Sequence, residues 1–216
     1  MFILPIPTYI EFRMWRRRSV IVWGLVAINA VAFFWTGRGD HFYLEQYGFV
    51  PASPSARAAV SSMFLHAGWI HLIGNMVFLI VFGRPVEHAI GALKFTAAYL
   101  LAGVMALWLH AMVTSSPGLP VVGASGAVSG AVGMFLALYP RAEVDLHAYL
   151  GYWHIKTWHT TGLVATGVWF GEQLLLAILT SATGGGGGIA FWAHVGGFVC
   201  GVVAGIAAGR LALGYP

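Results

Sequence analysis

Apolar residues dominate six stretches of the chain, and polar or glycine-rich segments separate them. Each stretch approaches the ~20 residues that a helix needs to cross a hydrocarbon core of ~30 Å. This pattern predicts six membrane-spanning helices joined by loops of different kinds. The expected spans are residues 20–35, 70–82, 95–113, 125–139, 163–180 and 189–208.

The composition supports a membrane protein. The 216 residues are 59% hydrophobic and 8% charged, and a soluble domain of this size could not bury so much apolar surface. We expect an all-α bundle of six transmembrane helices over residues 20–210. Residues 1–19 and 211–216 are expected to form short cytoplasmic tails. The single cysteine, Cys200, excludes an internal disulfide.

The basic residues predict the orientation of the spans. With the N-terminus in the cytoplasm, nine lysines and arginines lie on inner segments and two lie on outer segments. Such a bias towards the inner side is the usual topology signal, so both termini are expected in the cytoplasm. The inner residues are Arg13, Arg16, Arg17, Arg18, Arg84, Lys94, Arg141, Lys156 and Arg210, and the outer ones are Arg38 and Arg57.

The predicted loops differ in character. The outer segment 37–65 is too long for a simple turn and is expected to be structured at the membrane surface. The inner segment 140–162 is rich in aromatic residues and histidine, and no chemistry is evident in it. Five glycines before the last span form a flexible outer hinge, which we expect to admit substrate together with the fifth span. They are Gly184, Gly185, Gly186, Gly187 and Gly188.

Two spans carry small residues at helical spacing. Gly126 and Gly130 are four residues apart in the fourth span, as are Gly197 and Gly201 in the sixth. Stripes of this kind let membrane helices approach closely, so these glycines are expected to pack helices. Helix packing alone would explain them, but each stripe has a reactive polar residue at its outer end. These residues are Ser125 and His194.

The serine and the histidine are matched in depth. Ser125 precedes Arg141 by sixteen residues, and His194 precedes Arg210 by the same number. At ~1.5 Å per residue, both lie roughly 24 Å from the inner boundary. The sequence therefore predicts a serine nucleophile and a histidine base at one level, several ångströms below the outer surface and in a water-filled recess.

The second span contains a histidine and an amide on one helical face. His71 and Asn75 are four residues apart, and such polar side chains are costly in a membrane unless they pair or line a cavity. Two interpretations follow. The side chains can donate to a developing oxyanion, or they can form a polar clasp between helices.

The order of these motifs resembles the rhomboid family of intramembrane serine proteases. Gly123-Ala-Ser-Gly, His71-x-x-x-Asn and Ala193-His-x-x-Gly carry the resemblance. It implies that Ser125 is the nucleophile and His194 the base, without a third acidic residue. Asn75, His71 and the Ser125 N–H would form the oxyanion hole. It further implies membrane-anchored protein substrates within the lipid bilayer. No cofactor or metal is expected, and no nucleic acid either, since the basic residues sit between apolar segments as a topology signal.

The sequence departs from that family at two positions. Many members have a Trp-Arg pair in the first outer loop, where this chain has Arg57-Ala58. Some members place an aromatic residue one turn after the serine, stacked on the histidine, where this chain has Ser129. We therefore expect packing from a neighbouring span to hold His194.

Other classes of membrane protein fit these motifs less well. A metalloprotease requires His-Glu-x-x-His, which Glu87-His88 does not supply. The aspartates Asp40 and Asp145 fall on opposite sides of the membrane, which argues against an aspartyl protease. A rhomboid-like binder that does not cut, or a small transporter using Glu172, remains open. The short six-span plan favours a bacterial inner membrane.

Overall fold

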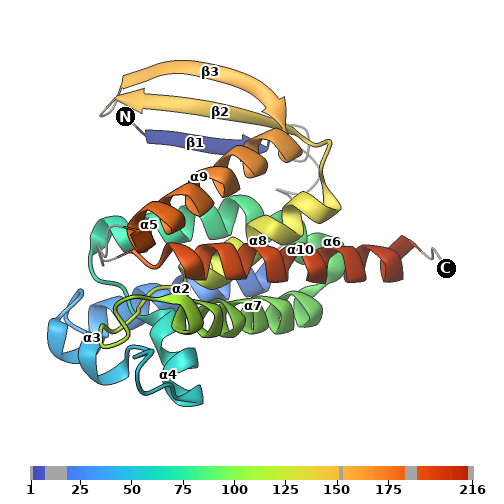
Figure 1. The fold of residues 1–216 in the computed structure, drawn as a ribbon. Coiled ribbons are helices and arrows are strands. Elements are labelled where there is room, and N and C mark those ends of the chain that lie inside the picture. Colours follow the sequence, from blue (N-terminus) through green and yellow to red (C-terminus); the bar gives the residue numbers. More distant parts are fainter. Residues whose placement is uncertain (1, 8–18, 151–152, 183–188, 214–216) are drawn as a thin grey trace.

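The computed structural model describes residues 2–7, 19–150, 153–182 and 189–213, and it is mainly helical with one small sheet (Figure 1). In chain order the elements are β1 Phe2–Pro7, α2 Val20–Trp35, α3 His41–Tyr47, α4 Ala56–Ser61, the 3₁₀ turn η1 Ser62–Phe64, α5 Trp69–Phe78, the π-helical segment η2 Leu79–Gly83, α6 Arg84–Ile90, α7 Ala92–Val113, α8 Ser125–Leu138, β2 Glu143–Leu150, β3 Trp153–Thr161, α9 Gly162–Ala182 and α10 Phe191–Leu213.

Four helical runs are long and apolar enough to cross a membrane. They are Trp69–Ile90, Ala92–Val113, Gly162–Ala182 and Phe191–Gly209. The other two predicted spans are also apolar helices, but α2 has 16 residues and α8 has 14. Large apolar side chains such as Ile70 and Val168 are exposed on the helices, as lipid-facing residues are. The chain is an integral, multi-pass membrane protein, and the crossing of all six helices stays a prediction.

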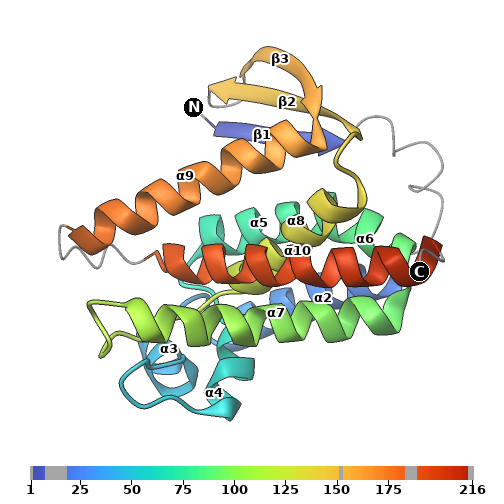
Figure 2. The same ribbon diagram turned by 45° about the vertical axis from the view of Figure 1, so that its right-hand side comes forward.

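Helix α8 forms the centre of the bundle. Residues 126–135 are all buried, and α10 and α7 lie alongside this helix in both ribbon views (Figures 1 and 2). Because residues at the contact are small, the backbones approach closely. Helix α9 runs obliquely to α10 and contacts it less extensively (Figure 2).

The predicted end of the second span at Phe82 is wrong, because the helix continues to Ile90. Arg84 was assigned to an inner segment, yet Arg84 and Pro85 are both buried within the continuing helix. A proline cannot donate a backbone hydrogen bond to the preceding turn, and a π-helical segment accommodates such an irregularity. The π-helical segment η2 ends two residues before Pro85.

A buried carboxylate explains why this extension is stable. The two carboxylate oxygens of Glu87 accept hydrogen bonds from the backbone N–H groups of Ile21, at 3.0 Å, and Val22, at 2.9 Å. These groups belong to the first turn of α2, whose N–H groups have no partner within the helix. The charge on Glu87 therefore serves as a helix cap supplied by a neighbouring helix, and it does not mark solvent.

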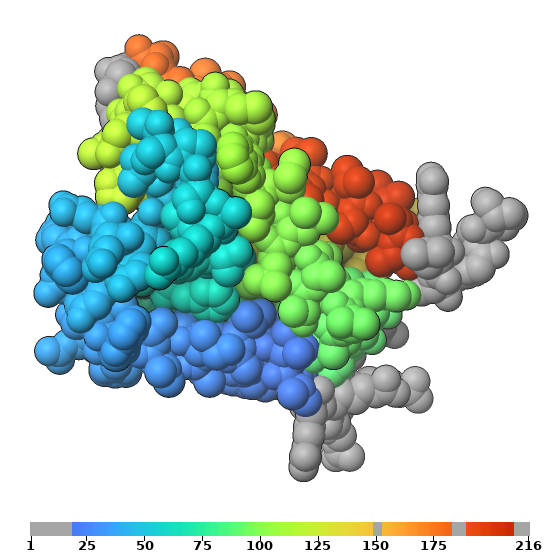
Figure 3. Space-filling view, turned by 90° about the horizontal axis from the view of Figure 1, so that it is seen from below, coloured from blue at the N-terminus to red at the C-terminus, as the bar shows by residue number. Residues whose placement is uncertain are grey.

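Segment 37–65, which is predicted to lie on the outer side of the membrane, is structured, as expected, and contains α3, α4 and η1. Phe49 is fully buried, and it exchanges two backbone hydrogen bonds with Val121, at 3.0 and 2.8 Å. The Ser62 carbonyl accepts from the Gly123 N–H at 2.9 Å. Figure 3 shows this segment beside α7 at one end of the molecule. The outer segment thus fixes the backbone that leads into α8.

A three-stranded antiparallel sheet of order β1-β2-β3 was not expected from the sequence. Residues 2–7, assigned to the N-terminal tail, pair with β2, and β3 pairs with its other edge. Val144 and Ala148 of β2 are fully buried, whereas Asp145 is paired with His159 at 2.6 Å. The sheet lies on the side of α9 that faces away from the other helices (Figure 1).

Candidate active site

One cavity of about 1040 Å³ lies between α5, α8, α9 and α10, next to the loop before α8. It contains the four polar residues that the sequence singled out for chemistry. Ser125, His194, His71 and Asn75 all line it, although they lie on three separate helices. The fold therefore gathers these side chains around one space.

Ser125 is the first residue of α8 and is half-buried. The first backbone hydrogen bond that closes this turn runs from Val128 to Ala124, so the Ser125 N–H lies in the turn without an internal acceptor. The positive end of the helix dipole adds to the attraction for negative charge at this point. The start of α8 can thus present both a hydroxyl group and a backbone donor to one ligand.

Gly123 shapes the approach to the serine. Its φ of +120° lies in a region that residues with side chains rarely adopt. A Cβ atom added at Gly123 would also lie 2.5 Å from Nε2 of His71. The imidazole of His71 therefore packs directly on the glycine backbone, two residues before Ser125.

His71 and Asn75 lie one turn apart on α5. The Ala67 N–H donates to Nδ1 of His71 at 3.4 Å, which leaves Nε2 as the protonated nitrogen of the neutral ring. The Asn75 side-chain amide donates to the His71 carbonyl at 2.8 Å. Nε2 of His71 is thus the donor that faces Gly123, while Asn75 is bonded to its own helix.

His194 is held by α9. Its Nδ1 lies 2.7 Å from Oε1 of Gln173, and its ring stacks on that of Trp169 with 6.5 Å between centroids and 27° between planes. Phe191 contacts the imidazole edge-on, at 6.0 Å and 85°. Among the residues that the structure describes, no hydrogen bond joins Ser125 to His194. Catalytic hydrogen bonds are often long without substrate and shorten when it binds.

The small residues of α8 and α10 face each other. The Gly126 carbonyl lies against Gly197, and the Gly130 carbonyl lies against Gly201, so closely that a Cβ atom at either α10 position would overlap the α8 backbone. Ser125 adjoins the first of these contacts. The helix pair that carries the serine and the histidine is therefore joined backbone to backbone.

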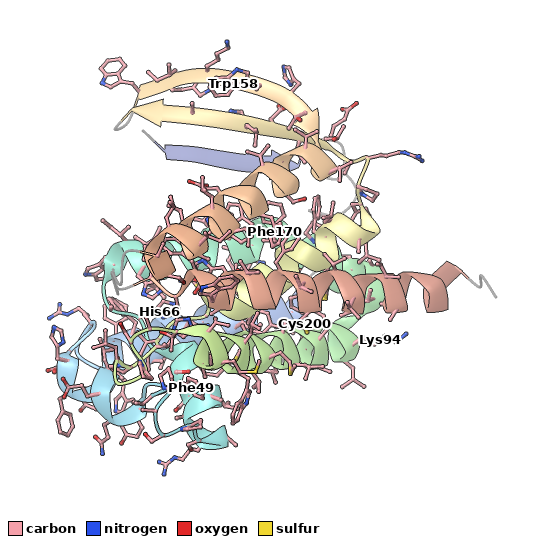
Figure 4. All side chains as sticks on the ribbon, viewed as in Figure 1. Phe49, His66, Lys94, Trp158, Phe170 and Cys200 are labelled. Atoms are coloured by element: carbon pink, nitrogen blue, oxygen red, sulfur yellow. The ribbon has the colours of Figure 1, made fainter. Side chains whose placement is uncertain are left out.

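Aromatic contacts connect α9 to α10, which carries His194, and to α5. Phe170 stacks on Phe198 of α10, with 4.4 Å between ring centroids and 19° between planes. Figure 4 shows Phe170 on the side of α9 that faces the bundle. Trp169 also contacts Phe198, at 6.1 Å, and Phe78 of α5 at the same distance. Helix α9 thus contacts α10 and α5, two of the helices that border the cavity.

The structure adds cavity residues that the sequence did not single out. Trp169, Gln173 and His110 line the cavity, and Gln173 is only 8% exposed. A glutamine within an apolar span was the available signal, since a buried amide needs a partner. Glu172, the residue considered for transport, is exposed and lines the same cavity.

Two further expectations concern the remainder of the site. The proposed hinge Gly184, Gly185, Gly186, Gly187 and Gly188 lies outside the described residues. No group of three or more histidine, cysteine, aspartate or glutamate side chains suited to a metal ion occurs in the described part of the chain.

Comparison with known proteins places the chain in a family. The Rhomboid domain family model matches residues 55–211. Rhomboid protein 1, mitochondrial, of Saccharomyces cerevisiae is 28% identical over 195 residues, which are 86% of this chain and 52% of that protein. Rhomboid-like protease 1 of Toxoplasma gondii is 32% identical over 139 residues, covering 64% of this chain and 42% of that protein.

A third relative is the presenilin-associated rhomboid-like protein, mitochondrial, of Rattus norvegicus. It is 30% identical over 132 residues, or 58% of this chain and 34% of that protein. The chain thus spans about half or less of the length of these three relatives. All three are eukaryotic, so they do not support the expected bacterial inner membrane. The family model covers most of the chain, and the protein belongs to the rhomboid family.

Proposed function

We propose that this protein is an intramembrane serine endopeptidase that cuts membrane-anchored proteins in or near a transmembrane segment. The observation that carries the proposal is the single cavity lined by Ser125, His194, His71 and Asn75. A nucleophile, a base and hydrogen-bond donors around one space are the parts that acyl transfer requires.

The reaction divides into two steps. In the first, Oγ of Ser125 attacks the scissile carbonyl carbon, and its proton passes to Nε2 of His194. The carbonyl π electrons move to oxygen, and the tetrahedral intermediate then expels the amine, which takes the proton from His194. In the second step, water attacks the carbonyl carbon of the acyl-enzyme and gives a proton to His194. The ester bond to Ser125 then breaks, and His194 returns the proton to Oγ of Ser125.

The oxyanion is stabilised by donors on two helices. The Ser125 N–H stands at the start of α8, and Nε2 of His71 faces Gly123 nearby. Asn75 becomes the third donor when its amide turns from the His71 carbonyl towards the substrate. Fixed donors of this kind favour the transition state because they need little reorganisation as charge develops.

Substrate enters the cavity sideways from the lipid. We propose that α9 and the glycine segment that follows it move to admit a transmembrane helix, as gating elements do in other enzymes. Helix α9 contacts α10 less extensively than α8 does, which suits it to such movement. The dyad requires neither metal nor cofactor.

A non-cleaving binder of membrane helices would use the same cavity without Ser125 as a nucleophile. Glu172 would be the central residue of a transporter, because an intramembrane carboxylate often marks an ion path. The Ser–His constellation favours proteolysis over both alternatives, and a cleavage assay separates them.

The test is cleavage of a single-span reporter in liposomes by the wild type and by Ser125→Ala and His194→Ala. We expect both variants to lose at least about a thousand-fold in rate, since each removes a reacting group. Ser53→Ala and His41→Ala replace exposed residues outside the cavity and should cleave at the wild-type rate. Undiminished cleavage by Ser125→Ala would overturn the proposal.

A further inference from the structure

Helix α9 supplies a hydrogen-bond acceptor to His194. Gln173 is buried, and its Oε1 lies 2.7 Å from Nδ1 of the imidazole. A carbonyl oxygen can only accept, so Nδ1 must carry the proton of the neutral ring. Nε2 is then the nitrogen with the lone pair, which is the state a general base requires.

The ring plane is fixed by the same helix. Trp169 stands four residues before Gln173, one helical turn away, and stacks on the imidazole at 27° between planes. The alternative position for a supporting ring, one turn after Ser125 on α8, holds Ser129. The Ser129 hydroxyl instead donates to the Ser125 carbonyl at 2.6 Å. Orientation of His194 therefore comes from α9, with Phe191 at the ring edge.

We propose that Gln173 is a positioning residue that holds His194 in the Nδ1–H tautomer, so that Nε2 can accept the proton of Ser125. This inference rests on the proposed function. When the imidazole takes up that proton, the Nδ1–H bond to Oε1 of Gln173 persists and stabilises the positive charge. When the proton passes to the leaving amine, the ring returns to the same tautomer.

This arrangement couples substrate entry to the chemistry. Gln173 and Trp169 belong to α9, whose movement is proposed to admit the substrate helix. Displacement of α9 would break the hydrogen bond to Nδ1 and release the imidazole. The histidine becomes a competent base again when α9 returns, which confines proton transfer to the closed state.

The experiment compares two substitutions that differ in one property. Gln173→Met keeps the side-chain length and removes the strong acceptor, whereas Gln173→Glu keeps an acceptor at Nδ1. We expect Gln173→Met to lower kcat for the liposome reporter by about 10- to 100-fold, with KM changed by less than about twofold. Gln173→Glu should retain kcat within about tenfold of wild type, because its oxygen fixes the same tautomer.

Two further readouts separate positioning from packing. In Gln173→Glu, the acid limb of the pH–rate profile should move up by about one pH unit, because a carboxylate beside the imidazole favours the protonated ring. In the wild type, ¹⁵N NMR of His194 should show Nδ1 protonated at neutral pH, and this signature should be lost in Gln173→Met. Leu175→Ala, an exposed position on α9, controls for general disturbance of the helix.

The outcomes keep this inference distinct from the proposed function. Loss of cleavage in Ser125→Ala together with an unchanged kcat in Gln173→Met would overturn the role of Gln173 alone. Equal losses of kcat in Gln173→Met and Gln173→Glu, with the same pH–rate profile in both variants, would also overturn it. Cleavage that persists in Ser125→Ala would instead overturn the protease assignment, whatever Gln173 does.

Discussion

At the scale of single residues, the imidazoles of His71 and His194 are each oriented by a specific neighbour. Nδ1 of His71 accepts from the Ala67 N–H, and Nδ1 of His194 is matched to Gln173. The first contact leaves Nε2 of His71 as a donor that faces Gly123. The second leaves Nε2 of His194 as an acceptor. Two imidazoles with opposite tautomers can therefore serve opposite roles around one substrate carbonyl.

Asn75 is expected to act on the transition state. Asn75→Ala should lower kcat by about tenfold or more and leave KM nearly unchanged, because the oxyanion forms only as the reaction proceeds. Reporter cleavage rates at several substrate concentrations measure both constants. Ile73→Ala, an exposed neighbour on α5, is the matched control. A normal kcat in Asn75→Ala would indicate that Asn75 has only a structural role, as the polar-clasp interpretation holds.

Gly123 is expected to tolerate no side chain. Gly123→Ala places a methyl group against Nε2 of His71 and strains a backbone with φ of +120°, at a cost of about 1–3 kcal/mol. Both the thermal midpoint and the cleavage rate should fall. Gly118→Ala, where a Cβ atom would meet open space, should change neither. Wild-type behaviour of Gly123→Ala would show that His71 does not pack there.

The residues that line the cavity could be chosen from sequence only in part. Ser125, His71 and His194 stood out because each is a reactive group in an apolar setting. Trp169 carries no such mark, since a tryptophan is common in membrane helices. Gln173 stands out as an amide in an apolar span, but the sequence does not show which helix supplies its partner. Their roles depend on how α9 meets α10.

At the scale of elements, the site depends on the close contact between α8 and α10. The carbonyls of Gly126 and Gly130 lie against Gly197 and Gly201, which leaves no space for side chains. In a bilayer, packing of this kind replaces the hydrophobic effect as the force that joins helices. The contact sets the separation of the serine and histidine helices.

A methyl group at this contact should push the helices apart. Gly201→Ala is expected to destabilise the protein by about 1–3 kcal/mol, as over-packing usually does, and to slow cleavage by displacing His194. Thermal unfolding in detergent and reporter cleavage measure the two effects. Gly167→Ala, on α9 and facing open space, should be neutral or slightly stabilising. Equal stability of the two variants would contradict the packing role.

Hydropathy predicted the apolar helices but not what lies between them. The extension of the second span to Ile90 was not predicted, because Arg84 was assigned to an inner segment, whereas in the fold Glu87 caps α2. The antiparallel pair β2 and β3 was not predicted, although Val144 and Ala148 are spaced as strand residues with one buried face. Both structures depend on contacts between segments that are distant in the sequence.

At the scale of the whole molecule, the cavity lies between a closely packed core and a less extensively packed helix. Helices α8 and α10 form the core, and aromatic rings of α9 contact Phe198 of α10. Ile70 of α5 and Leu176 of α9 both line the cavity. Movement of α9 away from α5 is therefore the proposed route for a substrate helix.

Linking α9 to α5 should block that route. Ile70→Cys with Leu176→Cys, in a Cys200→Ser background, can be joined by crosslinkers of graded length. We expect short linkers to slow cleavage of a membrane-anchored reporter by about tenfold or more, and long linkers to restore it. The two single-cysteine variants control for modification alone. Equal rates with every linker would indicate another entrance.

The most direct test of the account is covalent labelling of the nucleophile. A fluorophosphonate should phosphonylate Oγ of Ser125 with loss of fluoride, and peptide mass mapping of the purified protein locates the adduct. We predict a single labelled serine, Ser125, and a loss of labelling in His194→Ala, because the histidine activates the hydroxyl. Absence of an adduct on Ser125, or undiminished labelling in His194→Ala, would contradict the proposed dyad.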